Sequence, residues 1–387
     1  MTVPVLEQAG LDAARWERAV ELAREACAAD ATPALAFVAG NSGRATGAHR
    51  FGRQRLAEGS PPLREDAIFL VASLTKPIVA MGFLLLVERG RLSLNERVSE
   101  FLPEFGGTGR HAVTLRHLLT HTSGLPDQLP HNRRLRSENA PLSAFVAGAC
   151  AVAPDFPPGR GVQYSSMAFA LLGEIVRRIT GKTCAEFLRH ELFAPLGMAD
   201  TALGAPDGWF DGDAPAAARI PEIRVPPDQV GDEGWNWNSR YWRQLGAPWG
   251  GLLTTPADLA RFAQFMLRRG RSESHRLLSE AAVLAATRSQ LDAIPDLSDA
   301  DRRCRPWGLG WRLQWPAHAA SFGDFVGPRA FGHWGATGTL LWIDPDRDAF
   351  AAVLSTQPAA SHSAPLVRLS NAIAAALGAG IEVPTGP

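Results

Sequence analysis

The sequence predicts an α/β (α+β) fold, in which an antiparallel sheet formed by both ends of the chain is flanked by helices and a mostly helical domain is inserted. Apolar, strand-like segments lie at both ends of the chain, at residues 33–39, 45–52, 308–314, 337–343 and 349–354. Helical spacing dominates between residues 91 and 200. A chain of 387 residues suits two closely packed domains. We expect one from residues 1–88 and 245–387 and another from residues 89–244, with the functional site at their interface.

The most apolar helix predicted in the chain spans residues 73–89. Its apolar side chains cover nearly the whole circumference, which places this helix in the core. A short apolar segment, residues 66–72, leads into the helix, and Gly90 ends it. Because Pro77 follows in the first turn, we expect an irregular start.

Further helices are predicted at residues 115–121, 167–180, 184–192, 256–268 and 366–377. Gly181 ends the second of these, and Thr255 caps the start of the fourth. Residues 203–250 are rich in Gly, Pro, Asp and Trp and show weak periodicity. This composition predicts a long functional loop or lid rather than a packed element. Residues 344–348 supply the turn of a C-terminal hairpin.

The composition is typical of a soluble globular protein that binds neither nucleic acid nor membrane. Basic and acidic residues number 39 each, so no excess of charge favours a polyanionic partner. No window approaches the ~20 apolar residues of a membrane span. Charged residues interrupt residues 1–30 throughout, which argues against a secretory signal and predicts a cytoplasmic location.

No pattern in the sequence indicates a metal or another cofactor. The four cysteines are far apart and form no C-x-x-C pair. His117 and His121 are four residues apart, but no third ligand accompanies them as it does in a zinc helix. We therefore expect the protein to need no cofactor.

Ser73 and Lys76 form a Ser-x-x-Lys pattern at the start of the core helix. Residues three apart share a helix face, so the hydroxyl and the amine can meet within hydrogen-bonding distance. Only two of the 39 basic residues are lysines, so a lysine here suggests that a removable proton is needed. Burial would lower the pKa of Lys76 and let it accept the proton of a serine nucleophile. A lysine that reaches solvent is the alternative.

Four motifs occur in an order that resembles one family: residues 73–76 (Ser-Leu-Thr-Lys), 115–125, 164–166 (Tyr-Ser-Ser) and 332–335 (Gly-His-Trp-Gly). Together they look like the penicillin-recognising serine hydrolases, which include serine β-lactamases and penicillin-binding proteins. The branch of the class C β-lactamases, family VIII carboxylesterases and D-aminopeptidases is the most similar. The resemblance covers about residues 10–375 and implies the β-lactamase-like fold.

The resemblance implies a role for each matching residue. Ser73 becomes the acylated nucleophile and Lys76 the base that activates it. Tyr164 relays a proton to the leaving group and then helps to activate water. The backbone N–H groups of Ser73 and Ala336 form the oxyanion hole.

Two motifs depart from those of the lactamases. His333, Trp334 and Gly335 match the lactamases' Lys-Thr-Gly substrate strand, with His in place of Lys, as in related esterases and peptidases. His333 would titrate near neutral pH unless it is a strand-edge residue with a water partner. Ser166 stands where the family usually has an Asn that contacts the substrate amide. The Ser166 departure puts β-lactam and peptide handling in doubt, whereas the His333 departure favours an ester or peptide role over antibiotic defence.

Aromatic residues suggest what the substrate carries. Ten of the 11 tryptophans lie at or after residue 209. Trp235, Trp237 and Tyr241 crowd the predicted loop, and large aromatic side chains near a cleft suit an apolar or aromatic group. The alternative is that these aromatic side chains only bury the loop.

The sequence therefore predicts a serine hydrolase that cleaves a small ester or amide through an acyl-Ser73 intermediate, most closely a carboxylesterase. Acyl transfer, including transesterification, and D-amino-acid peptidase activity are alternatives on the same scaffold. A weak β-lactamase or a non-catalytic penicillin-binding sensor is a further alternative, because Ser166 replaces the family Asn.

Overall fold

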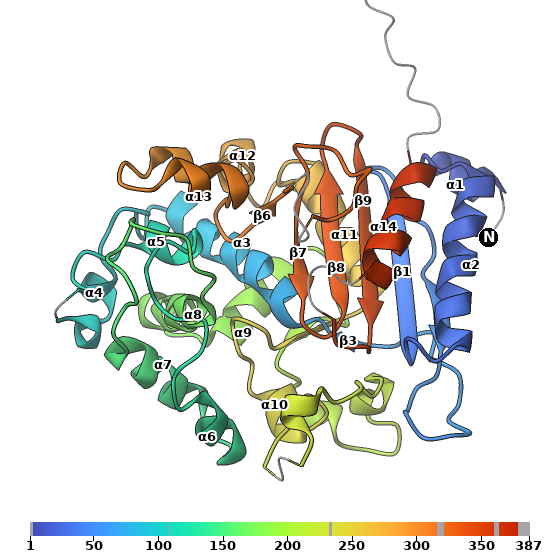
Figure 1. Ribbon diagram of the computed structural model, residues 1–387, viewed down its shortest axis with the longest axis horizontal. Coiled ribbons are helices and arrows are strands. Elements are labelled where there is room, and N and C mark those ends of the chain that lie inside the picture. Colours follow the sequence, from blue (N-terminus) through green and yellow to red (C-terminus); the bar gives the residue numbers. More distant parts are fainter. Residues whose placement is uncertain (1–2, 108, 232–233, 316–320, 360–363, 378–387) are drawn as a thin grey trace, which may run out of the picture.

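A six-stranded antiparallel sheet lies at the centre of the computed structural model, which describes residues 3–107, 109–231, 234–315, 321–359 and 364–377 (Figure 1). In the order β2-β1-β9-β8-β7-β6, its strands are β2 (His49–Gly52), β1 (Ala34–Gly40), β9 (Ala349–Ser355), β8 (Thr339–Asp344), β7 (Phe331–Gly335) and β6 (Arg312–Leu313). The two ends of the chain meet at its centre, because β1 pairs with β9 from Leu35↔Ser355 to Gly40↔Phe350. The predicted fold class is confirmed.

The sheet is buried on both faces, because its side chains alternate between two apolar clusters. In β1, Ala36 and Val38 belong to the larger cluster, whereas Leu35 and Phe37 belong to the smaller one. Helices α1 (Val3–Gln8), α2 (Ala13–Ala28) and α14 (Ala364–Ala376) cover the face of the smaller cluster, and α11 (Pro256–Leu267) covers the opposite face (Figure 1). Two-sided burial explains why β1 is a continuous apolar run.

A second region beside the sheet is mostly helical (Figure 1). Its helices are α3 (Thr75–Glu88), α4 (Val98–Phe101), α5 (Leu115–Leu119), α6 (Asn132–Ser137), α7 (Leu142–Ala151), α8 (Ser166–Thr180), α9 (Cys184–Leu188), α10 (Arg240–Gln244), α12 (Glu280–Ala286) and α13 (Asp299–Cys304). Single turns are η1 (Ala72–Leu74), η2 (Pro103–Phe105), η3 (Arg189–Phe193), η4 (Asp207–Trp209), η5 (Ala216–Arg219), η6 (Pro227–Gln229) and η7 (Leu291–Ala293). A small sheet pairs β3 (Phe69–Leu70), β5 (Leu252–Thr254) and β4 (Ala202–Leu203). No helix within the described ranges is both long and apolar enough to cross a bilayer.

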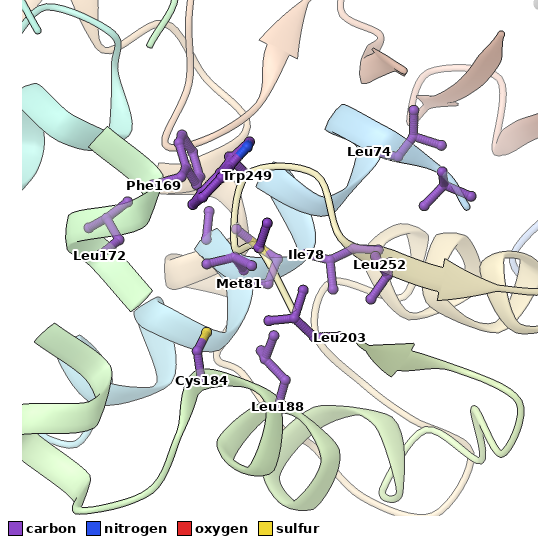
Figure 2. Packing of buried hydrophobic residues seen from close by; sticks show 14 of the residues in the cluster. Leu74, Ile78, Met81, Phe169, Leu172, Cys184, Leu188, Leu203, Trp249 and Leu252 are labelled. Atoms are coloured by element: carbon purple, nitrogen blue, oxygen red, sulfur yellow. The ribbon is translucent and has the colours of Figure 1, made fainter. Parts of the chain in front are cut away.

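Helix α3 is buried on all sides, as its sequence predicts, and its residues from Thr75 to Leu86 are all in the core. Figure 2 shows side chains of α8, α9, β4 and β5 gathered around it. The helix begins at Thr75, two residues later than predicted. Ala72 has a positive φ of 47°, and the Thr75 hydroxyl donates to the Ala72 carbonyl at 2.6 Å, which closes a separate 3₁₀ turn, η1.

Part of the segment 203–250 packs in the core, so the prediction that it is not a packed element is wrong for that part, whereas its described residues show little regular secondary structure, as predicted. Trp235, Trp242 and Trp249 are at most 5% exposed and belong to the larger cluster. The guanidinium of Arg136 in α6 lies 4.5 Å from the ring centre of Trp235 and 4.7 Å from that of Trp242. Aromatic burial and cation–π contacts hold this segment with little regular secondary structure.

Ser370 links α14 to the sheet, and we predict that Ser370→Ala destabilises the protein. The buried Ser370 hydroxyl accepts from Trp342 Nε1 at 2.9 Å and donates to the Phe322 carbonyl at 2.6 Å. Its loss leaves two buried polar groups unpaired, at a cost of about 1–3 kcal/mol in the free energy of unfolding. Urea unfolding measures this cost. Ser143→Ala, at an exposed serine of α7, is the control and should stay within about 0.5 kcal/mol of wild type. Equal midpoints for both variants would contradict the prediction.

Candidate active site

Ser73 lies in the turn η1, where α3 meets the sheet. The hydroxyls of Thr337 and Thr339 donate to two carbonyls just before this turn, at 2.8 and 2.9 Å. Gly335 of β7 comes so close that a Cβ there would collide with the carbonyl of Val71. The end of β7 therefore holds the turn in place, and this close approach requires a glycine at position 335.

Lys76 is completely buried beside Ser73. Its Nζ lies 3.1 Å from Ser73 Oγ and donates to the Trp249 carbonyl at 2.8 Å. Burial lowers the pKa of Lys76 to about 7, although the carboxylate of Asp127 opposes this shift. A large fraction of the amine is therefore neutral near neutral pH and can accept a proton.

Tyr164 completes the group, just before the start of α8. Lys76 Nζ lies 4.6 Å from the centre of its ring. Burial raises the pKa of Tyr164 well above its ordinary value, and a hydrogen bond with the Ser73 side chain offsets part of that rise. The structure thus brings the three residues predicted to be catalytic into direct contact.

A cavity of about 350 Å³ opens at Ser73. It is lined by Ser73, Val162, Tyr164, Arg305, Trp307, Arg312, Trp315, His333, Trp334, Gly335, Ala336 and Ala359. These residues come from segments far apart in the chain, which the sheet and α8 bring together. Six of them were predicted from the sequence, including Ala336 of the predicted oxyanion hole.

His333 is neutral in the structure, so the prediction that it titrates near neutral pH is wrong. Burial, reinforced by the nearby Lys76, lowers the pKa of His333 well below its ordinary value. Its Nδ1 lies 2.7 Å from the Trp334 carbonyl, which can only accept, so Nδ1 carries the proton. Nε2 therefore presents a lone pair, and no described residue donates to it.

Four of the predicted substrate residues, Ser166, Trp235, Trp237 and Tyr241, do not line the cavity. Ser166 donates both its backbone N–H and its hydroxyl to Asp127 Oδ1, at 2.9 and 2.6 Å. Trp235 and Trp237 pack on the larger cluster, and the Tyr241 hydroxyl donates to the Ala140 carbonyl at 2.8 Å. Trp334 does line the cavity, but it is also part of the smaller apolar cluster, near α14.

Sequence reasoning missed the aromatic and cationic wall of the cavity. The Arg312 guanidinium lies 4.1 Å from the ring centre of Trp315 and 5.9 Å from that of Trp307. Burial lowers its pKa to about 10, so it stays charged at neutral pH. No described residue forms a hydrogen bond or ion pair with it, and its Nε is buried without a partner. The available signal was an arginine inside a run of tryptophans, residues 307–315.

Comparison with known proteins agrees with this geometry. The family model described as Beta-lactamase matches residues 19–376. Esterase EstB of Burkholderia gladioli is 31% identical over 310 residues, which cover 74% of each chain. Penicillin-binding protein 4 of Amycolatopsis lactamdurans is 29% identical over 304 residues, which cover 75% of this chain and 72% of that protein. A crystal structure of a penicillin-binding protein homologue from Caulobacter crescentus superposes with a TM-score of 0.76 at 25% identity, over 95% of this chain and 99% of that one.

The chain belongs to the Beta-lactamase family, which confirms the resemblance found in the motifs. It is a serine hydrolase, an enzyme with an acyl-serine mechanism.

We predict that kcat/KM falls on the acid side with a midpoint near pH 7, because the neutral Lys76 amine is the active form. The pKa of Lys76 is lowered, so activity is present above pH 7 and is lost as the amine takes up a proton below it. His121 and His333, whose pKa values lie well below their usual range, do not account for such a midpoint. A pH profile of ester hydrolysis measures it. A midpoint below pH 5 would exclude Lys76 as the titrating base.

Proposed function

We propose that the protein hydrolyses a small carboxylic ester through an acyl-Ser73 intermediate. The observation that carries this proposal is the 3.1 Å contact between Ser73 Oγ and a buried Lys76 whose pKa is lowered to about 7. A neutral amine at this distance can take the serine proton as Oγ attacks. The similarity to an esterase over three quarters of the chain supports the same reaction class.

In the proposed reaction, Ser73 Oγ bonds to the ester carbonyl carbon and its proton passes to Lys76. The backbone N–H groups of Ser73 and Ala336 stabilise the oxyanion. No acceptor for the Ala336 N–H occurs among the described residues, which supports this role. As the bond to the alcohol breaks, Tyr164 delivers its proton to the leaving oxygen and takes up the proton held by Lys76, which leaves the amine neutral again. Water, activated by the same groups, then releases the acid and restores Ser73.

Two features favour an ester over a peptide or β-lactam substrate. Ser166 cannot replace the amide contact of the family Asn while its hydroxyl donates to Asp127. The neutral His333 offers an acceptor, Nε2, where the lactamases have a cation. The cavity walls come from both expected domains, which supports a site at their interface.

We predict that Ser73→Ala abolishes hydrolysis of p-nitrophenyl esters and that Lys76→Ala lowers kcat by about 10³-fold or more, because the group acts as a unit. Release of p-nitrophenol measures turnover, and mass spectrometry of the enzyme detects the acylated Ser73. An adduct on wild type without turnover, with product formed only after an alcohol or amine is added, would indicate an acyltransferase instead. Near-normal activity of Lys76→Ala would refute the mechanism.

We further propose that the substrate carries a negative charge beside its apolar or aromatic part. Arg312 is a charged, half-buried group in the cavity. Its Nε is buried without a partner, and no described residue forms an ion pair with it, whereas Arg305 is paired with Asp301. Burying an unpaired charge costs free energy, which an anionic ligand would recover. Trp307 and Trp315 supply the apolar surface around it.

We predict that Arg312→Met lowers kcat/KM for mono-p-nitrophenyl glutarate by about 10-fold or more, because a charge-assisted hydrogen bond contributes about 1.5–3 kcal/mol. The rate for neutral p-nitrophenyl pentanoate should change little. Steady-state kinetics on this matched pair measures the effect. Equal losses on both esters would assign Arg312 a purely structural role.

A further inference from the structure

His121 is fully buried beside Tyr164 and binds the backbone on both sides of it. Its carbonyl accepts the N–H of Gln163 at 2.9 Å, and its Nδ1 accepts the N–H of Ser165 at 3.0 Å. The His121 and Tyr164 ring centres are 4.7 Å apart. His121 has a positive φ of 57°, an unusual conformation outside glycine that tight surroundings must maintain.

The His121 ring acts here as a neutral acceptor. A backbone N–H can only donate, so Nδ1 holds a lone pair and the ring proton sits on Nε2. Burial and the nearby Lys76 keep the pKa of His121 well below its usual range. The ring is enclosed by Phe169 and Trp307, with centres at 5.6 and 4.4 Å. Its acceptor atom therefore stays available at every pH at which the enzyme would work.

We infer that His121 is the positioning residue of Tyr164, and that its Nδ1 and carbonyl together hold the tyrosine hydroxyl at Ser73. This inference rests on the proposed role of Tyr164 as the proton donor to the leaving group. Ser165 also caps α8, since its hydroxyl accepts the N–H of Ala168 at 3.0 Å. The backbone on both sides of Tyr164 is thus bound to His121, and the residue that follows Tyr164 is also anchored by the start of α8.

The test compares His121→Gly with His121→Asn. Both residues tolerate a positive φ, but only Asn keeps an acceptor near the position of Nδ1. The measured quantity is the ratio of kcat/KM for the ethyl and p-nitrophenyl esters of one acid, per active site titrated with a fluorophosphonate. Nitrophenolate leaves without a proton, whereas ethoxide needs one. We expect His121→Gly to lower this ratio about 10-fold or more and His121→Asn to stay within about 3-fold of wild type.

Two reference variants separate the possible outcomes. Tyr164→Phe defines the full selective loss. Ser123→Ala is the control, because among the described residues the buried Ser123 hydroxyl contacts only the N–H of Leu125, at 3.2 Å. If Tyr164→Phe is selective and His121→Gly lowers both rates equally, the inference is overturned and the proposed function stands. If Tyr164→Phe is not selective, the proposed role of Tyr164 itself fails. If His121→Gly has no active sites that react with the fluorophosphonate, His121→Ala replaces it. A selective loss of the ethyl ester would then support the inference, and equal losses on both esters would overturn it.

Discussion

The amine of Lys76 is buried, with only neutral groups in hydrogen-bonding contact, and the rest of the site depends on this constraint. An ammonium ion in an apolar interior costs several kcal/mol, so the group loses its proton readily and its pKa falls to about 7. Only the Ser73 hydroxyl and the Trp249 carbonyl are within hydrogen-bonding reach among the described residues. The burial that makes the lysine hard to charge also makes it a base near neutral pH. The burial of helix α3 from Thr75 to Leu86 and its close packing in the larger cluster keep this amine away from solvent.

The tryptophan-rich segment, residues 203–250, contributes the Trp249 carbonyl that Lys76 contacts, which its sequence does not reveal. The Trp249 indole is in the larger cluster, 5.5 Å between ring centres from Phe145 of α7, so its carbonyl has a fixed place beside Lys76. Trp235 and Trp242, which come earlier in the same segment, are held by cation–π contacts with Arg136 of α6. These aromatic residues lie outside the cavity and hold a carbonyl beside the amine. The aromatic surface of the cavity comes instead from Tyr164, Trp307, Trp315 and Trp334.

Much of this arrangement follows from local sequence, and the rest from contacts that no local pattern encodes. The apolar runs predicted the central strands, and Ser73, Lys76 and Tyr164 were found because four short motifs occur in an order that resembles one family. The start of α3 was misplaced because the Ala72–Thr75 hydrogen bond closes a separate turn. The packing of Trp235, Trp242 and Trp249 was missed because tertiary burial, rather than periodicity, holds them. The state of His333 depends on the depth of its burial and on Lys76, which is distant in sequence. Arg312 is visible in the sequence, but only the fold shows that no described residue forms a hydrogen bond or ion pair with it.

The His at position 333 also determines how charge is distributed in the cavity. A lysine there would place a second ammonium near Lys76, and like charges would lower the pKa of both amines. A neutral His333, held by its bond to the Trp334 carbonyl, removes that repulsion and leaves the protonation of Lys76 governed mainly by burial. Since Arg305 is paired with Asp301, the lasting unpaired charge among the described lining residues is that of Arg312, stacked on Trp315. In the proposed function the site thus separates two tasks: a removable proton at Lys76 serves the chemistry, and a permanent charge at Arg312 selects the substrate.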